Sequence, residues 1–496
     1  MKVILALSAL GIIALLAELF RFKKALFPII MLGLFGALYA AISYWGYSDG
    51  NLTPYFTGMV DNNHHIPDPS QLTGSYSFAQ MLSFDKSSVL ISSIMIVTSL
   101  LWFVMSQGFF ADESSRSDKY SLVIFSLVGA VILSCYSNLV MLFLGVEILS
   151  IPLYVLAGSS KSDLRSNESA FKYFLLGSFA SAFLLFGIAM IYGATGSFDM
   201  KMIGFAVNSG AAQPVGLLYC GIIMMLVGLF FKIGAAPFHF WAPDVYQGAP
   251  TQVTGFMATV VKTAAIIAIM RLFSNAVFAG VTTFWTPIFV GCIALTFIIS
   301  NISAVMQDSV KRIFAFSSIS HAGFLLLAVT SFCAFSGKAI IYYVAAYSVA
   351  SITAFTVLIN ILEQTGGDLV DNFNGLGKKN PMLAVAMTIA LLSLAGIPPT
   401  AGFFAKYYVL NAALVSGHYG LAILAILGSL VGVYYYFRII IAMYFKESKT
   451  DTVINAGNLH RALLFITAVA TLVLGLLPDL LLNIGAGSAA SQVITP

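Results

Sequence analysis

The chain has 496 residues, of which 59% are hydrophobic and only 9% charged, and its formal net charge is +4. Soluble proteins usually carry about 25% charged residues, so this composition excludes a soluble globular protein and indicates one embedded in a bilayer. The basic residues form no run suited to nucleic acid, and no nucleic-acid partner is expected.

The first apolar stretch is predicted to be a retained helix. Its basic cluster of Arg21, Lys23 and Lys24 follows the apolar run, whereas a cleaved signal peptide carries its positive charge before it. The four cysteines lie singly in apolar stretches, without a CxxC or CxxCH motif. This supports neither an iron–sulfur cluster nor c-type haem in the chain, and we expect no metal site.

The sequence predicts an all-α polytopic membrane protein with about fourteen transmembrane helices. Each apolar run has close to the 20 residues or so that cross a bilayer, and the long twelfth run is taken as one interrupted helix. The runs lie at about 3–20, 25–46, 87–107, 120–136, 138–158, 170–192, 214–236, 253–273, 281–300, 311–332, 338–362, 382–416, 420–445 and 460–483.

The lysines and arginines of the loops indicate how the chain is oriented. Those in odd-numbered loops far outnumber those at the N-terminus and in even-numbered loops, where Arg271 is counted. Because cytoplasmic loops are rich in these residues, both termini are predicted to lie on the outer side. The long polar stretch 47–86 is then an outer loop. Its His64–His65 pair, without further ligands, is a weak metal motif, and we expect a solvated loop.

Two predicted helices are broken by proline, and a buried lysine accompanies each break. Lys232 lies five residues before Pro237, and Lys406 lies seven residues after Pro399. Broken backbone at membrane depth persists only where it is buried in protein or lines a wet cavity. Water beside a buried lysine is what a proton relay requires. We therefore predict that both lysines carry protons, the alternative for Lys232 being a surface anchor that snorkels to the headgroups.

Three further ionisable residues lie within apolar helices. Glu147 is the only charge in the fifth, and it is predicted to be the counter-ion of Lys232, a pair that can titrate as a unit; the alternative is a static ion pair. Lys262 lies about ten residues into the eighth helix and is predicted to relay protons. His321, in SSISHAGF, belongs to a residue type that titrates near neutrality, and its neighbouring serines could hold water. A packed core histidine is the alternative.

Two other basic residues are left with open roles. His239 follows the break of the seventh helix, where it either lines a cytoplasmic opening of the relay or merely caps the structure. Arg438 lies near the cytoplasmic end of its helix, where snorkelling and function are equally compatible with its position.

The polar positions recur along the chain, which predicts an internal repeat. Each pair is offset by five helices, and an odd offset reverses the second copy across the membrane, as in the inverted repeats of transporters. The pairs, spaced by 174–176 residues, are Glu147 with His321, Lys232 with Lys406, and Lys262 with Arg438. The predicted divisions are 1–107 with the loop 47–86, a first unit 119–273, a second unit 281–445, and 460–496 with the last helix.

Three stretches of the chain resemble a known family. They are FFKIGAAPFHFWAPDVYQGAPTQVTGFMATVVK, SSISHAGF and LAGIPPTAGFFAKYYVL, and they look like the antiporter-like membrane subunits of the respiratory NADH:quinone oxidoreductase, complex I, over about residues 85–445. The resemblance implies fourteen core helices, two inverted five-helix units and broken seventh and twelfth helices. It places the family's key residues at Glu147, Lys232, Lys262 and Lys406. One type of such subunit has glutamate at the position of Lys406, and another has extra C-terminal helices.

The resemblance also implies a function and partners. This chain would translocate protons, driven by electron transfer from NADH to quinone in other subunits, which would hold the FMN and the iron–sulfur clusters. Its partners would be the other membrane-arm subunits, the lipid bilayer and protons, in a bacterial inner membrane. A subunit of a cation/proton antiporter complex is the alternative. A purely structural scaffold is disfavoured, because four midplane charges would cost roughly 10 kcal/mol if insertion costs added.

Overall fold

The computed structural model describes residues 1–20, 22–43, 81–112, 115–273, 276–333, 335–448 and 456–484. Within these residues the regular elements are helices, with only isolated backbone bridges between extended residues. Most of the predicted outer loop 47–86, including His64 and His65, lies outside the described residues, and so does Arg21.

The described helices match the fourteen predicted crossings. Twelve are long and apolar enough to span a membrane, and the short first helix and the broken pair 381–415 supply the others. The crossing helices are α1 (Lys2–Leu16), α2 (Leu26–Ser43), α4 (Lys86–Met105), α5 (Arg116–Cys135), α6 (Leu139–Ala157), α7 (Leu164–Thr195), α9 (Val215–Ile233), α11 with α12 (Thr251–Phe256 and Lys262–Phe273), α13 (Thr282–Val305), α14 (Val310–Thr330), α15 (Ser336–Thr365), α17 with α18 (Pro381–Ala395 and Ala401–Val415), α19 (Tyr419–Phe445) and α20 (Asn458–Leu476).

The remaining elements are short. They comprise the α-helices α8 (Met200–Asn208), α10 (Trp241–Gly248), α16 (Leu376–Lys379) and α21 (Asp479–Ile484), the 3-10 turns Lys23–Ala25, Gln107–Phe110, Ala276–Val281 and Val370–Phe373, and a π-helical turn at Met257–Val261.

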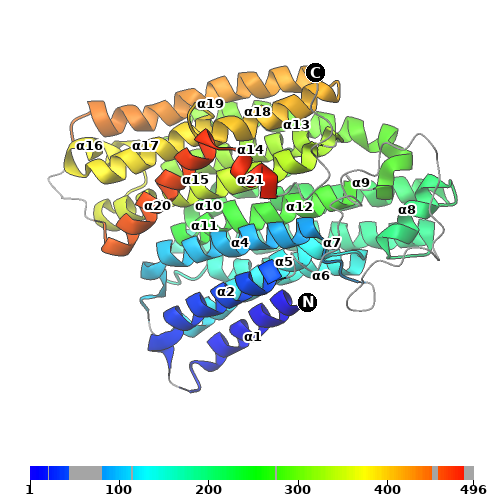
Figure 1. Cartoon of the computed structure of the whole chain (residues 1–496), viewed down its shortest axis with the longest axis horizontal. Helices are drawn as coiled ribbons and strands as arrows, with labels where there is room; N and C mark the ends of the chain where they lie inside the picture. The colour runs from blue at the N-terminus through cyan, green and yellow to red at the C-terminus, as the bar shows by residue number, and fades with distance from the viewer. Residues whose placement is uncertain are drawn as a thin grey trace.

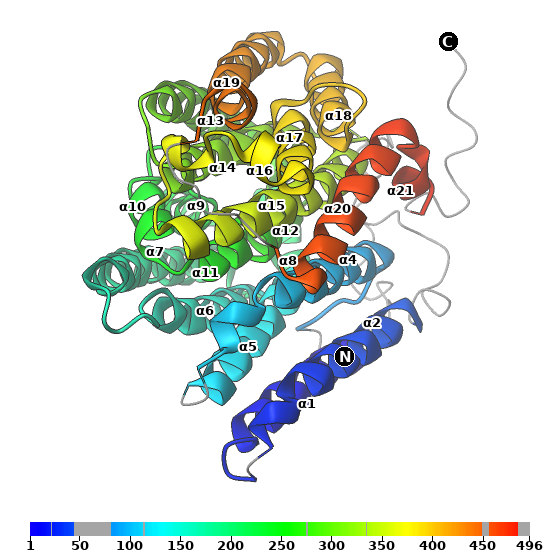
Figure 2. The same cartoon turned by 90° about the vertical axis from the view of Figure 1, so that its left-hand side faces the viewer.

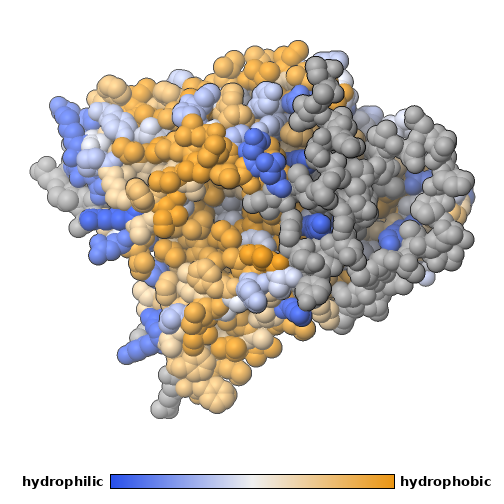
Figure 3. Space-filling view, viewed as in Figure 1, coloured by the Kyte–Doolittle hydropathy of each residue, from blue (hydrophilic) through white to orange (hydrophobic). Residues whose placement is uncertain are grey.

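The crossing helices run side by side along the long axis of the molecule (Figure 1). In the view along this axis, α1 and α2 form a hairpin at one edge, while α20 lies between α4 and the helices of the second half (Figure 2). Hydrophobic residues cover the middle of the described surface in Figure 3, and hydrophilic side chains gather at its left end. This distribution is what a bilayer imposes on a helical bundle.

The centre of the bundle consists of α11 with α12, α14 and α15. The apolar stretches of Thr251–Phe273 and Val310–Thr330 are wholly buried, and that of α15 is 94% buried, against 39% for α7, α13 and α19. A helix that is apolar all round must face either lipid or other helices. Lys262 and His321 belong to these two wholly buried stretches and are 4% and 5% exposed.

The two halves of the chain share a local feature at a common spacing. An isolated antiparallel bridge joins Asn138 to Asp199, and another joins Ser309 to Leu369. Asn138 and Ser309 each cap the following helix, accepting a hydrogen bond from Val140 N at 2.8 Å and from Arg312 N at 3.3 Å. Such side-chain caps satisfy backbone donors that a helix start leaves unpaired.

This spacing offers a second way to align the two predicted units. Ser309 follows Asn138 by 171 residues, and His321 follows Ser150 by the same distance. Aligned on the caps, His321 in α14 therefore corresponds to Ser150 in α6, not to Glu147. The two alignments, at spacings of 174 and 171 residues, differ by three residues, slightly less than one helical turn.

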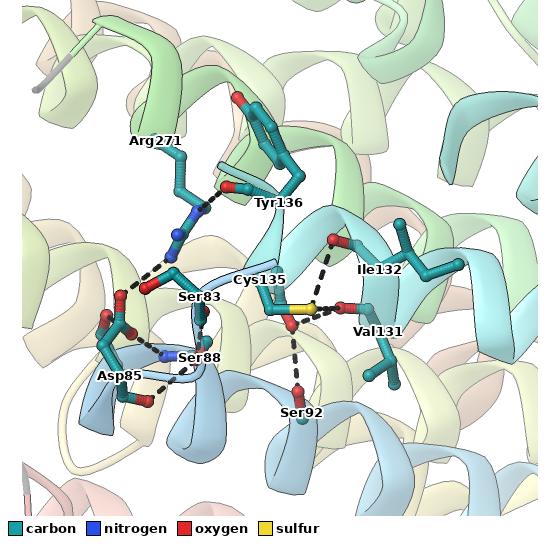
Figure 4. Close-up of polar contacts among 11 residues, drawn as sticks. Ser83, Asp85, Ser88, Ser92, Val131, Ile132, Cys135, Tyr136 and Arg271 are labelled. Atoms are coloured by element: carbon teal, nitrogen blue, oxygen red, sulfur yellow. Dashed lines mark hydrogen bonds and ion pairs between the residues drawn. The ribbon is translucent and has the colours of Figure 1, made fainter. Parts of the chain in front are cut away.

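At one end of α12 a buried ion pair ties three helices together (Figure 4). Arg271 Nη1 lies 3.1 Å from Asp85 Oδ2, and the two side chains are 2% and 13% exposed. Arg271 Nε also donates to Tyr136 O at 3.2 Å, while the Tyr136 hydroxyl donates to Ala268 O at 2.7 Å. Asp85 itself caps α4. Arg271 was counted with the loops from the sequence, but it is buried in the last turn of α12.

Candidate functional site

Four ionisable side chains are buried in the middle of the bundle. Fully buried lysines are rare in proteins because the charge loses its hydration. The four, each on a different helix and at most 9% exposed, are Lys232 on α9, Lys262 on α12, His321 on α14 and Lys406 on α18. Since α12 packs against both α9 and α14, and α14 packs against α18, the four form a row across the bundle, which we call the lysine row.

Lys232 lies in the last turn of α9 and is held by neutral groups. Its Nζ donates to Ser150 Oγ at 2.7 Å and to the Tyr173 hydroxyl at 3.1 Å. It also lies 5.8 Å and 5.3 Å from the ring centroids of Tyr154 and Tyr173, within the range of a cation–π attraction. Neither the serine nor the tyrosines were predicted as partners from the sequence.

Glu147 does not form the expected direct ion pair with Lys232. Among the described residues no basic group lies within ion-pair distance of its carboxylate, and its Oε1 is buried without a hydrogen-bond partner. Ser150, on the same helix, takes its place at the amine. Glu147 instead shares a stripe of α6 with Leu144 and Ile151, which are 40% and 54% exposed. The carboxylate is still near enough to interact electrostatically with Lys232.

The helix break after Lys232 is fully supported by protein groups. α9 ends at Gly234, whose positive φ of 73° turns the chain out of the helix. The carbonyl of Phe231 accepts from Trp241 Nε1 at 3.0 Å, and Ala236 N donates to Thr296 Oγ1 at 3.0 Å. Backbone groups freed at membrane depth need such partners, so the break is a stable part of the fold.

Lys262 follows directly after the π-helical turn Met257–Val261. Such turns are rare in helices and occur often at functional sites. Its Nζ donates to both the carbonyl and the hydroxyl of Ser318, and Tyr347 donates to the same hydroxyl at 3.1 Å. A small cavity, with about 10 Å³ of room for water, is lined by both Lys232 and Lys262. With polar groups at its wall, this is about the space of a single water between the two amines.

His321 is enclosed by hydrogen-bonding side chains. Its Nδ1 lies 2.6 Å from the Tyr343 hydroxyl and its Nε2 lies 3.4 Å from the Tyr436 hydroxyl. A second small cavity, also with about 10 Å³ of room for water, lies beside it and is also lined by Ser393 of α17 and Ala405 of α18. The three neighbouring serines, which were predicted to hold water, each bind a side chain of another helix: Ser317 binds Tyr436, Ser318 binds Lys262 and Ser320 binds Asn301.

Lys406 uses the backbone that the second break sets free. Its Nζ donates to Ala395 O, in the last turn of α17, at 2.9 Å and to Ser429 Oγ at 3.2 Å. Gly396 ends α17 with a φ of +84°, and a Cβ there would lie 2.7 Å from Lys406 Cδ. Only glycine therefore allows both the turn and the approach of the lysine.

The two broken-helix lysines are not equivalent with respect to their breaks. Lys232 lies on the half-helix before Gly234, whereas Lys406 lies on the half-helix after Gly396. The two glycines are 162 residues apart, whereas the two lysines are 174 residues apart. Lys232 and Lys406 therefore lie on the two helices that were predicted to be equivalent, but on different sides of the break in each helix.

His239 and Arg438 lie apart from the lysine row. His239 is 4% exposed in the turn between α9 and α10, and its Nδ1 has no partner among the described residues. Arg438 donates to Gln307 O at 2.8 Å and forms an ion pair with Asp308. It thereby fastens α19 to the turn between α13 and α14. Within the described ranges, no cluster of three or more histidine, cysteine or acidic side chains suited to a metal occurs.

Comparison with known proteins decides the family. The model of the NADH:quinone oxidoreductase/Mrp antiporter transmembrane family matches residues 136–432. The chain belongs to this family. The matched stretch contains the whole lysine row and both helix breaks, and the resemblance predicted from the sequence is confirmed.

Relatives within the NADH:quinone oxidoreductase/Mrp antiporter family match over nearly the whole chain. The NADH-quinone oxidoreductase subunit N of Cytophaga hutchinsonii is 41% identical over 488 residues, 98% of this chain and 99% of the relative. The subunit N of Flavobacterium psychrophilum is 40% identical over 98% of this chain and 100% of its own length.

Solved structures of the family have the same fold. A chain of the respiratory complex I from Thermus thermophilus, with 31% identity, superposes with a TM-score of 0.77 over 98% of this chain and 100% of that one. A chain of the Mrp complex from Dietzia sp., with 22% identity, superposes with a TM-score of 0.81 over 99% and 97%. At that lower identity the likeness concerns the fold alone.

Proposed function

We propose that the chain is the N-type membrane-arm subunit of a bacterial NADH:quinone oxidoreductase, and that the lysine row translocates protons. Electron transfer from NADH to quinone in other subunits drives this transport, and those subunits hold the FMN and the iron–sulfur clusters. The observation that carries the proposal is the row itself: three buried amines and an imidazole on adjacent helices, separated by two cavities and accompanied by two supported helix breaks.

The contacts of the amines suit proton exchange better than static pairing. Within the described part of the chain no carboxylate lies within ion-pair distance of Lys232, Lys262 or Lys406. Each amine is bound instead by hydroxyl or carbonyl oxygens. A static buried ion pair would fix the charge of a lysine, whereas an amine held by neutral oxygens can give its proton to a water in the neighbouring cavity.

The coupling between the sites follows from their like charge. Two ammonium groups facing one buried cavity repel each other strongly, because the interior screens charges poorly. A proton arriving at Lys232 therefore favours release from Lys262, and a charge on Lys262 acts in turn on the far end of the row, where Lys406 lies. In this scheme Lys406 has the exit role, and Lys262 and His321 relay between the halves.

Glu147 acts on Lys232 from beside the row. It adjoins the exposed Leu144 and Ile151 on α6, but its Oε1 is buried and has no partner in the described chain. A buried unpaired carboxylate oxygen is costly, so a water enclosed within this chain is the fitting partner. From this position Glu147 modulates Lys232 at a distance, and His239 remains a candidate for the cytoplasmic opening of the relay.

The shared caps and bridges support two five-helix units, 119–273 and 281–445, with helix 14 in 460–496 closing the bundle. The excess of lysine and arginine in the odd loops supports a placement in the bacterial inner membrane with both termini on the outer side. The alternative, a subunit of a cation/proton antiporter complex, is less well supported, because the relatives named subunit N are near 40% identical and the Mrp chain is 22% identical.

The test is Lys232→Ala in the intact complex. Protons translocated per NADH oxidised should be measured in sealed membrane vesicles at equal complex content. We expect pumping to fall severalfold and NADH oxidation to slow with it. Lys446→Ala is the matched control, since Lys446 is 51% exposed and lies outside the row. Parent-like pumping by a correctly assembled Lys232→Ala complex would overturn the assignment.

A further inference from the structure

We propose that Tyr436 is a proton-relay residue that connects His321 to Ser317, which makes His321 a branch point of the lysine row. The inference rests on the proposed function, because it names a further route for the same protons. It would give the second half of the chain its own connection toward the start of α14, separate from the cavity between Lys232 and Lys262.

The geometry consists of one continuous string of hydrogen bonds. The Tyr436 hydroxyl contacts Ser317 Oγ on one side and lies 3.4 Å from His321 Nε2 on the other. The Tyr343 hydroxyl lies 2.6 Å from His321 Nδ1. The four side chains come from three helices, α14, α15 and α19, and each is at most 5% exposed. Bulk water therefore does not compete for these contacts.

Every member of the string can both donate and accept. A hydroxyl has one proton and two lone pairs, and a neutral imidazole has one nitrogen of each kind. In one arrangement Tyr343 donates to Nδ1, Nε2–H donates to the oxygen of Tyr436, and Tyr436 donates to Ser317. In the other arrangement each of these three bonds is reversed, while the heavy atoms keep their places.

Switching between the two arrangements moves one proton. In the direction from Ser317 to Tyr343, Ser317 Oγ accepts a proton and passes its own proton to Tyr436. Tyr436 then passes its own proton to His321 Nε2. The proton on His321 Nδ1 passes to the oxygen of Tyr343, which releases a proton to the adjoining cavity. One proton is gained at Ser317 and one is lost at Tyr343. No charge remains in the string.

The string leads out of the lysine row along α14. Ser317 lies one turn before His321, nearer to the start of the helix at Val310, which the loop charges predict to be cytoplasmic. At the other end, Tyr343 and His321 both line the cavity that reaches Ser393 and the Lys406 helix. The string thus joins the Lys406 side of the row to a point nearer that predicted cytoplasmic end.

The neighbouring residue Tyr435 provides a matched control. It lies on the same helix and is as deeply buried, at 2% against 1% for Tyr436. Its hydroxyl lies 3.5 Å from Asn301 Oδ1 and also interacts with the Tyr436 hydroxyl, but it makes no hydrogen bond to His321 or Ser317. Replacing either tyrosine with phenylalanine removes one buried hydroxyl and nothing else, so a general effect of that loss appears in both variants.

The experiment compares Tyr436→Phe and Tyr435→Phe in the intact complex, by NADH-driven proton translocation into sealed vesicles. We expect Tyr436→Phe to pump at least threefold more slowly than Tyr435→Phe at equal complex content, and Ser317→Ala to match Tyr436→Phe. Equal pumping by the two phenylalanine variants overturns the inference. If the Tyr436→Phe complex fails to assemble, Ser317→Ala decides, and parent-like pumping by that variant overturns it as well.

Failure of the inference can be separated from failure of the proposed function. If Tyr436→Phe pumps normally while Lys232→Ala and His321→Ala do not, the lysine row carries protons and the string does not. If Lys232→Ala and His321→Ala also pump normally, the proposed function itself is wrong.

Discussion

The buried ion pair between Arg271 and Asp85 allows a quantitative test of what holds the Lys262 helix in place. Arg271 lies nine residues after Lys262 in α12, and its guanidinium contacts Asp85 at 3.1 Å and Tyr136 O at 3.2 Å (Figure 4). Removing one partner of a buried pair typically costs about 3–5 kcal/mol, because the other is left as an uncompensated charge. We expect Arg271→Gln and Asp85→Asn each to lower the free energy of local opening of α12 by about this amount.

The assay is amide hydrogen exchange of residues 268–273 in the detergent-solubilised complex, corrected for intrinsic exchange, which reports the free energy of local opening. The double variant Arg271→Gln/Asp85→Asn is the control, since it removes both charges and should lose less than the two single variants combined. A loss below about 1 kcal/mol for Arg271→Gln would refute the reasoning.

Three further predictions concern the lysine row and the residues beside it. Glu147→Gln should pump better than Glu147→Ala and worse than Glu147→Asp, because glutamine keeps the shape without the charge; equal pumping by all three would make Glu147 a packing residue. Lys406→Glu should keep a titratable step and pump, whereas Lys406→Met should not, and parent-like proton uptake by the methionine variant would place Lys406 off the path. Gly396→Ala should slow pumping with normal assembly, because its Cβ would meet Lys406 at 2.7 Å; an unaltered rate would show that the lysine can adjust.

Much of the fold could be predicted from the sequence, because a helix that crosses a bilayer needs a long apolar run. The fourteen crossings and both helix breaks correspond to described helices. Arg271 was misplaced in a loop, since composition alone does not reveal that Asp85, 186 residues away, is its partner. Short elements such as α8 and α10 gave no membrane signal and were not predicted.

The residues of the candidate site could be predicted only in part from the sequence. The buried lysines were conspicuous in apolar helices, but their partners were not, because serine and tyrosine are ordinary residues there. Lys232 binds Ser150 and Tyr173, which are 82 and 59 residues away in the sequence. Glu147 was assigned to Lys232 on charge alone. Successive residues of a helix turn by about 100°, so Ser150 lies only about 60° from Glu147 around α6. Sequence alone therefore does not decide which of the two side chains meets the amine.

The most direct measurement of the central claim is the ratio of protons translocated to NADH oxidised in vesicles that contain Lys262→Met. Lys262 lies in a wholly buried helix between the two cavities, so a proton that follows the row has to pass it. Methionine fills a similar volume and carries no proton. The account predicts that pumping through this subunit stops, either with a lower ratio or with NADH oxidation slowed to the same extent. A normal ratio at a normal rate of NADH oxidation, with the complex fully assembled, would contradict it.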